Sequence, residues 1–187
     1  MEDSRTLSFA GGLLRDRLGD RLGMASITAL LYTQNDALRL GRALETVYAC
    51  DEILVVDQGS QDATVRIARE YGARVVDARR GPSPADYLRA CSSPGADAGW
   101  ILCLDPRESL TEKLAASLFE WKSEAVRGHA PAYSVFLREE TAGGWLEGHA
   151  AQTRLVPSGW KAWDGKLPVH EPAALALEGE LLRFAFP

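Results

Sequence analysis

The stretch that decides the fold is DEILVVDQGSQDATVRIAREYGARVV, residues 51–76. Its apolar run at residues 53–56 predicts a buried strand, which ends at Asp57 and Gly59. Residues 73–78, ARVVDA, predict a second strand, and the segment between the two has apolar residues at helical spacing. The stretch therefore predicts a strand, a helix and a strand in succession, which is the repeating unit of a parallel α/β sheet.

The helix of this unit has recognisable ends. We expect Ser60 to cap it, because a serine hydroxyl accepts a hydrogen bond from a free N–H of the first turn. Asp62 falls in the expected first turn, and Gly72 suits the C′ position. The inner face of the helix is expected to consist of Thr64, Ile67, Ala68 and Tyr71.

The same alternation extends in both directions. Residues 26–32, SITALLY, predict a strand that precedes a second helix, and Asp36 suits the first turn of that helix. Residues 100–104 predict a fourth strand, and Ser109 with Glu112 matches a capping box that opens another helix. We therefore predict an α/β fold, a mostly parallel sheet flanked by helices with right-handed crossovers.

Two regions depart from this alternation. Residues 79–99 are rich in proline and glycine and leave room for a short helix near residues 85–91. After Gly128, short segments between glycines and prolines predict a small antiparallel extension of the sheet near the C-terminus. We expect a single domain over residues 24–187, with Met24 placed where a start codon would fit. Residues 1–23 are expected to be an extension that is loosely ordered or forms a helix on a membrane or partner.

Length and composition describe an ordinary globular domain. The chain has 187 residues, of which 46% are hydrophobic and 25% charged. Its net charge of −5 argues against general nucleic-acid binding. Three cysteines, Cys50, Cys91 and Cys103, lack metal-site spacing, and we expect Cys50 and Cys103 to be reduced, buried thiols of a cytoplasmic protein. No apolar run approaches the roughly 20 residues of a membrane span.

Polar residues follow three of the predicted strands. The clusters are TQND at residues 33–36, DQGS at residues 57–60 and DPRE at residues 105–108. Parallel strands bring their carboxyl ends to one edge of the sheet, where ligands bind in folds of this kind. The sequence therefore predicts one binding site built from three strand ends.

These segments resemble glycosyltransferase family 2, most closely the bacterial branch that builds the inner core of lipopolysaccharide. The resemblance rests on ITALLYTQND, DEILVVDQGSQDATVRIAREYGARVV, GWILCLDPRESLTEKL, GGW and LPVHEP, and it covers roughly residues 26–172. It implies the GT-A fold, a nucleotide-sugar donor, and Mg or Mn as the metal.

The resemblance also implies roles for individual residues. Asp57 would accept a hydrogen bond from the nucleotide base, and Asp105 matches the first acid of the metal motif. His170 and Glu171 match a motif that closes over the donor. The residues implied to lie near the nucleoside or to shape its loop are Thr33, Asn35, Asp36, Gly59, Ser60 and Asp62.

The chain departs from the family pattern at the metal motif. Arg107 stands where the second acid is expected, while Asp105 and Glu108 are the remaining oxygen ligands for a cation. Either the metal still binds, or Arg107 supplies its positive charge and grips phosphate, or Arg107 pairs with a neighbouring acid and the site is inactive. Metal-dependent transfer, metal-free transfer and a catalytically weak relative therefore all stay open.

Other departures and alternatives concern single residues. Asp86 and Tyr87 replace a basic residue and an asparagine of the family, and Glu147 is the nearest acid to the expected catalytic base. The chain also ends soon after VHEP, where relatives usually continue. Several residues also have an ordinary interpretation as turn caps, solvated loops or packing residues. They are Asn35, Asp36, Asp57, Arg79, Arg80, His129, Trp145, His149, Trp160, Trp163 and His170.

The predicted function is transfer of a sugar from a nucleotide-sugar donor to a cell-envelope saccharide or lipid acceptor, with inversion at the sugar. We expect the protein in the cytoplasm, at the inner face of the membrane with peripheral contact, and without a nucleic-acid partner. The alternative is an inactive relative that binds a nucleotide, a nucleotide-sugar or a partner protein. A nucleotidyltransferase fits less well, because TQND stands where a glycine-rich basic loop is expected.

Overall fold

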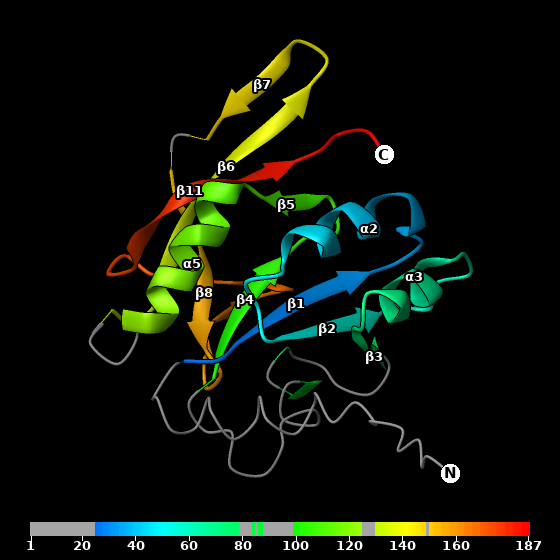
Figure 1. Ribbon diagram of the computed structural model, residues 1–187, viewed down its shortest axis with the longest axis horizontal. Helices are drawn as coiled ribbons and strands as arrows, with labels where there is room; N and C mark the ends of the chain where they lie inside the picture. The colour runs from blue at the N-terminus through cyan, green and yellow to red at the C-terminus, as the bar shows by residue number, and fades with distance from the viewer. Residues whose placement is uncertain (1–24, 79–83, 85, 88–98, 125–129, 149) are drawn as a thin grey trace, which may run out of the picture.

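One curled sheet organises the chain (Figure 1). The computed structural model describes residues 25–78, 84, 86–87, 99–124, 130–148 and 150–187. The strand order of the large sheet is β3-β2-β1-β4-β8-β6-β11-β5, and β7 pairs with β6. The predictions for residues 1–23, Arg79, Arg80, Cys91, His129 and His149 lie outside the described residues.

The first half of the sheet is parallel. Its strands are β3 (Arg74–Asp77), β2 (Glu52–Asp57), β1 (Ile27–Thr33) and β4 (Trp100–Leu104). β1 and β2 are apolar along nearly their whole length because helices or loops cover both faces of this half. The α/β fold predicted from the alternating pattern is confirmed.

Three helices lie on the same face of the sheet (Figure 1). They are α2 (Ala37–Thr46), α3 (Thr64–Glu70) and α5 (Glu112–Glu124). Leu40 and Leu44 of α2, Ala68 of α3 and Leu114 of α5 are buried in one apolar cluster beneath them. This cluster fixes the helices against the sheet, and so fixes where each preceding loop lies.

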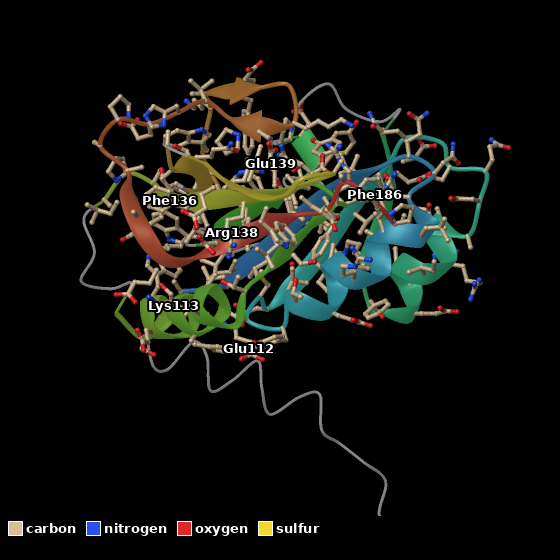
Figure 2. All side chains as sticks on the ribbon, turned by 90° about the horizontal axis from the view of Figure 1, so that it is seen from above. Glu112, Lys113, Phe136, Arg138, Glu139 and Phe186 are labelled. Carbon is tan, nitrogen blue, oxygen red and sulfur yellow. The ribbon has the colours of Figure 1, made fainter. Side chains whose placement is uncertain are left out.

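The second half of the sheet is mixed. β8 (Gln152–Pro157) runs antiparallel to β4 and to β6 (Tyr133–Thr141), whereas β11 (Leu175–Arg183) runs parallel to β6. β7 (Gly144–Glu147) extends β6 as a hairpin. Figure 2 shows Phe136, Arg138 and Glu139 along β6, and Phe136 is exposed. Four strands after residue 128, β6, β7, β8 and β11, thus join the same sheet.

The sheet closes back towards its first half. β5 (Glu108–Leu110) follows β4 after a three-residue turn, yet it pairs with β11 at the far end of the strand order. There β5 also meets α2, because the Leu110 N–H donates to the hydroxyl of Thr46 at 3.0 Å. The turn between β4 and β5 therefore connects the middle of the sheet to its β5 edge, beside α2.

A small antiparallel hairpin covers the other face. It consists of β9 (Trp163–Asp164) and β10 (Leu167–Pro168). Trp160, Trp163 and Leu167 pack against a second apolar cluster that contains Leu30, Val56, Tyr87 and Cys103. Trp160 and Trp163 thus serve as packing residues, with their indole N–H groups bonded to backbone carbonyls at 2.8 and 3.0 Å.

The structure corrects three predicted helix ends. Ser109 lies in β5, and it is the Thr111 hydroxyl that accepts the Leu114 N–H at 3.3 Å at the start of α5. Ser60 does not cap α3, since its hydroxyl is bonded to Asp57, and the residue before α3 is Ala63. Asp36 and Asp62 were expected in the first turns of α2 and α3, but both precede them, because these helices begin at Ala37 and Thr64. Gly72 follows α3 with φ +76°, as expected of a C′ glycine.

Candidate functional site

The loops after β1, β2 and β4 lie side by side at one edge of the sheet, which we call the rim. Thr33 at the end of β1 is in register with Asp57 at the end of β2, and the Gln58 N–H donates to the Thr33 carbonyl at 2.8 Å. β4 flanks β1 on the other side, with Leu104 opposite Leu31. The prediction that three polar strand ends share one edge is confirmed.

The loops after β1 and β2 hold each other through side chains. The Asn35 N–H donates to the Ser60 hydroxyl at 2.9 Å, and Asn35 Oδ1 accepts the Gln61 N–H at 2.8 Å. One oxygen of Asp62 accepts the Ala37 N–H at 3.2 Å, and the other accepts the Thr64 hydroxyl at 2.5 Å. The hydrogen bond from Thr64 lowers the pKa of Asp62, which keeps this carboxylate charged as an acceptor. The predicted loop residues therefore form one preorganised unit.

Asp57 shapes the turn that follows β2. Its carboxylate accepts the Gly59 N–H at 3.1 Å, the Ser60 N–H at 3.1 Å and the Ser60 hydroxyl at 2.5 Å. Gly59 has φ +86°, a conformation that costs little only in glycine. The turn-cap interpretation of Asp57 thus holds, and a base contact would have to share an oxygen with these donors.

Asp105 and Arg107 face each other across the turn after β4. The guanidinium forms a fork, with Nε 2.9 Å from Asp105 Oδ1 and Nη2 3.2 Å from Oδ2. Burial raises the pKa of Asp105, but the hydrogen bonds and charge of Arg107 outweigh it, so the pKa is lowered overall. Both side chains still reach solvent, and the Arg107 guanidinium favours the ionised form of Asp105.

Glu108 lies in the interior instead of on the rim. Its side chain is 0% exposed, and Oε1 accepts hydrogen bonds from Arg154 at 2.8 Å and Arg183 at 2.7 Å. Its Oε2 accepts the Asp105 N–H at 2.9 Å. Because both oxygens already bind protein donors, this placement does not suit Glu108 as a metal ligand. The residue instead anchors the turn that presents Asp105 and Arg107.

A hollow of about 290 Å³ lies at the rim. Asp36, Asp105 and Arg107 were expected there. Its remaining lining residues are Tyr32, Gln34, Arg39, Gln58, Pro106 and Lys166. Arg39 was overlooked although it stands one turn after Asp36 on α2. Lys166 had no signal in the sequence, because it arrives from the hairpin of β9 and β10, 108 residues after its partner Gln58.

The predicted catalytic residues do not line this rim hollow. Glu147 is exposed on β7 and lines a hollow of about 300 Å³. His170 is exposed and lines another hollow of about 410 Å³, together with Arg154 and Asp164. Glu171 is half-buried beside it, and one of its oxygens accepts the Ala173 N–H at 3.0 Å. The hairpin of β9 and β10 contributes residues to both the rim hollow and the His170 hollow.

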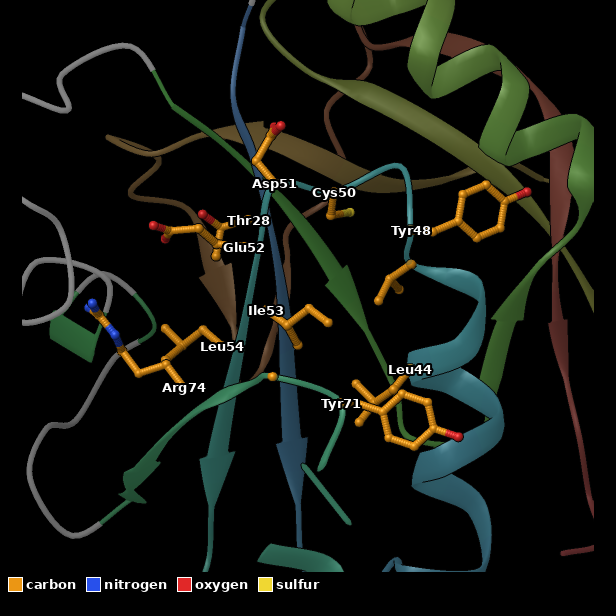
Figure 3. Close-up of a pocket in the computed structure, with 12 residues that line it drawn as sticks. Thr28, Leu44, Tyr48, Cys50, Asp51, Glu52, Ile53, Leu54, Tyr71 and Arg74 are labelled. Atoms are coloured by element: carbon orange, nitrogen blue, oxygen red, sulfur yellow. The ribbon is translucent and has the colours of Figure 1, made fainter. Parts of the chain in front are cut away.

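A larger hollow, of about 520 Å³, lies at the opposite ends of the strands (Figure 3). Leu44 and Tyr48 line it from α2 and the residues after it, Cys50, Asp51 and Ile53 from the start of β2, and Tyr71 from the end of α3. None of the residues that the resemblance assigns to a site lies there. The residues that line this hollow therefore give no support for sugar transfer there.

The donor set at the rim does not fit a divalent cation as arranged. Mg²⁺ requires about six oxygen ligands in near-octahedral geometry. Asp105 is occupied by the Arg107 fork, and Glu108 is enclosed in the interior. Within the described ranges, no three or more His, Cys, Asp or Glu side chains are grouped so that they could hold a metal ion.

Known proteins resemble this chain in sequence. An uncharacterised glycosyltransferase of Rickettsia bellii is 47% identical over 92 residues, which are 47% of this chain and 30% of that protein. A TPR repeat-containing protein of Synechococcus elongatus is 34% identical over 125 residues, 65% of this chain and 29% of that one. The 4,4'-diaponeurosporenoate glycosyltransferase of Staphylococcus aureus is 36% identical over 55 residues, 28% of this chain and 15% of that one.

These matches make the chain glycosyltransferase-like in sequence. It spans less than a third of each of these relatives. No model of a known protein family matches it.

Solved structures show a distant likeness. Glucosyl-3-phosphoglycerate synthase of Mycobacterium tuberculosis, crystallised with Mn²⁺, UDP and its product, has a TM-score of 0.43 and 19% identity, over 72% of this chain and 50% of that one. Mannosyl-3-phosphoglycerate synthase of Rubrobacter xylanophilus has a TM-score of 0.43 and 24% identity, over 66% of this chain and 42% of that one. In the described part of the chain, no helix is long and apolar enough to span a membrane.

Proposed function

We propose that this chain is a family 2 glycosyltransferase domain of the GT-A type, which binds a nucleotide-sugar at the rim. The observation that carries the proposal is the interlocked set of loops after β1 and β2, which meets the Asp105–Arg107 turn around one charged hollow. Ligands of open α/β sheets bind at this edge of the strands. The glycosyltransferase relatives support the same class of activity.

Each part of the rim suits one part of the donor. We assign the nucleoside to the loops after β1 and β2, whose polar edge of Asn35, Asp57 and Ser60 lies beside the buried Thr33. We assign Arg107, on the turn after β4, to the phosphates, because it lines the same hollow. The remaining loop residues, which hold this edge in shape, are Asp36, Gly59 and Asp62.

The proposed reaction is a single displacement. An acceptor hydroxyl oxygen attacks the anomeric carbon, the bond from that carbon to the diphosphate oxygen breaks, and the hydroxyl proton passes to a carboxylate. From the sequence, Glu147 is the proposed base, and His170 and Glu171 are proposed to close over the substrates. Because Glu147 lines a hollow apart from the rim, its role requires the substrates to reach β7. The proposal requires the acceptor to reach the rim from the hollow lined by His170, past the hairpin of β9 and β10.

The proposed acceptor is a cell-envelope saccharide or lipid-linked saccharide, as in lipopolysaccharide core assembly at the inner face of the membrane. The sequence motifs are the support for this choice. The second candidate function is nucleotide-sugar binding without transfer, and the fork between Arg107 and Asp105 favours it by occupying the expected metal acid.

Thermal unfolding with UDP, GDP and CMP, each with Mn²⁺ and with EDTA, tests the proposal. A ligand at about 100 times its Kd stabilises the folded state by about 2.7 kcal/mol, and at least one nucleotide should do so. Each variant's shift is measured against its own ligand-free midpoint. We expect Asp57→Ala to lose the shift and Arg66→Ala, on the exposed side of α3, to keep it. Failure of every nucleotide to raise the midpoint overturns the proposal.

A further inference from the structure

Three cations from three different elements surround the rim hollow. Arg39 comes from α2, Arg107 from the turn after β4, and Lys166 from the hairpin of β9 and β10. The carboxylates that line the same hollow are Asp36 and Asp105. The charged lining therefore has an excess of one positive charge, which favours an anion.

Two of these cations, Arg39 and Lys166, have no close ion pair with a carboxylate of the protein. The nearest contact of Arg39 to a carboxylate is 3.8 Å, from Nη1 to Asp36 Oδ1, and its Nε is buried without a hydrogen-bond partner in the structure. Lys166 Nζ binds the neutral oxygen of Gln58 at 2.5 Å and lies 5.6 Å from the centre of the Tyr32 ring. Among the described residues, no carboxylate lies within 4 Å of Lys166 Nζ.

Arg107 forms an ion pair with Asp105, but a bound anion can take the place of this carboxylate. Its guanidinium holds Asp105 through a two-point fork and stays 44% exposed. A phosphate offers the same two-point geometry, so Arg107 can bridge Asp105 and a phosphate or exchange one for the other. Asp105, in turn, keeps the guanidinium in place when the hollow is empty.

We propose that Arg39, Arg107 and Lys166 bind the diphosphate of the donor directly, so that donor binding does not require a divalent cation. This inference rests on the proposed function and assigns the charge that the metal would supply to three side chains. Arg39 and Lys166 approach from opposite sides of the rim, on a helix and on a hairpin that packs against the core. The developing charge on the leaving diphosphate would be met by the same cations.

Calorimetric titration of the full chain tests the inference. The probes are inorganic pyrophosphate, the nucleoside diphosphates UDP, GDP and CDP, and the corresponding nucleosides, each in EDTA and in Mn²⁺. We expect pyrophosphate and one nucleoside diphosphate to bind in EDTA with affinities within threefold of those in Mn²⁺. Binding should also weaken as salt is added, because the contacts are between charges.

Variants that remove single charges identify the side chains that bind the diphosphate. Lys166→Met and Arg39→Met should each weaken diphosphate and pyrophosphate binding at least tenfold, and Lys166→Arg should restore most of it. The affinity for the nucleoside should stay unchanged in all three. Lys161→Met removes an exposed lysine before the same hairpin and should have no effect.

The failures are distinguishable. Binding of a nucleoside diphosphate only in Mn²⁺, with Lys166→Met and Arg39→Met unchanged, overturns this inference and leaves the proposed function standing. Absence of binding for every nucleoside and diphosphate, with and without Mn²⁺, overturns the proposed function as well.

Discussion

Glu108 joins three elements through one carboxylate. It binds Arg154 of β8 and Arg183 of β11 and accepts the N–H of Asp105 at the end of β4. Arg154 is also fully buried, and its other contacts are the Cys103 carbonyl and Gln152. Such a group matters most when one partner is removed, because the remaining buried charges then lack compensation.

The variant Glu108→Gln should therefore be strongly destabilised. Loss of the carboxylate charge leaves Arg154 buried beside a neutral amide, and we expect the free energy of unfolding to fall by about 3 kcal/mol or more. Urea denaturation measures this. Glu70→Gln breaks an exposed ion pair with Arg66 on α3 and should cost under about 1 kcal/mol. Equal losses in the two variants would refute the anchoring role.

The sequence could place Glu108 at a strand end but could not tell which way it points. Its partners Arg154 and Arg183 lie 46 and 75 residues away in the chain, and nothing local identifies them. Local contacts were easier to predict: Arg107 was expected to bind phosphate or a neighbouring acid, and in the structure it pairs with Asp105. Lys166 was not predicted as a site residue, because its position depends on a hairpin that folds over the opposite face of the sheet.

At the scale of elements, β11 and α5 touch at a glycine. Gly179 has φ +92°, and a Cβ there would lie 2.7 Å from the Cα of Leu114 in α5. The register of β11 against β6 shifts at the same place, between Ala176 and Glu180. The bulge therefore lets helix and strand approach with backbone against backbone.

Gly179→Ala should disturb this contact. The added methyl group meets the backbone of Leu114, which cannot yield as a flexible side chain would, and the positive φ adds strain. We expect a loss of about 3 kcal/mol in the free energy of unfolding. Gly72→Ala is the matched control, with φ +76° and nothing within 4 Å of the new Cβ, and should cost about 1 kcal/mol. Comparable losses would show that α5 does not restrict this site.

Elements with strong periodicity were predicted well. The apolar runs became β1, β2, β3 and β4, and α2 and α3 follow β1 and β2 as expected. The predicted ends of elements were wrong where pairing with a distant strand decides them. Ser109 matches a capping pattern, but its pairing with Leu182 of β11 makes it part of a strand. The C-terminal strands were expected only in outline, because their partners are distant and their order is not a local property.

For the whole molecule, the two described thiols lie on opposite faces of the sheet. Cys50 packs against the helix-side cluster and Cys103 belongs to the hairpin-side cluster. Burial, with a smaller contribution from the charge of Asp51, raises the pKa of Cys50 from 9.0 to about 12. Burial likewise raises the pKa of Cys103 from 9.0 to about 12, although the charge of Arg154 opposes it.

Alkaline pH should therefore weaken the whole fold. Above pH 9 the unfolded chain loses these thiol protons while the folded chain keeps them, so stability is complete below pH 9 and declines as pH rises towards 12. Each thiol contributes a slope of about 1.4 kcal/mol per pH unit once ionised in the unfolded chain. Urea unfolding between pH 9 and 10.5 should give a shallower slope for Cys103→Ala than for the parent protein. Parallel slopes would contradict the prediction.

The short turn between β4 and β5 connects a central strand of the curled sheet to its β5 edge. Its shape depends on Arg183 bonding to Glu108 and on the Phe184 N–H donating to the Arg107 carbonyl at 3.0 Å. During synthesis, the loops after β1 and β2 emerge long before these residues do. The turn that presents Arg107 can therefore take this shape only after the final strand, β11, has docked.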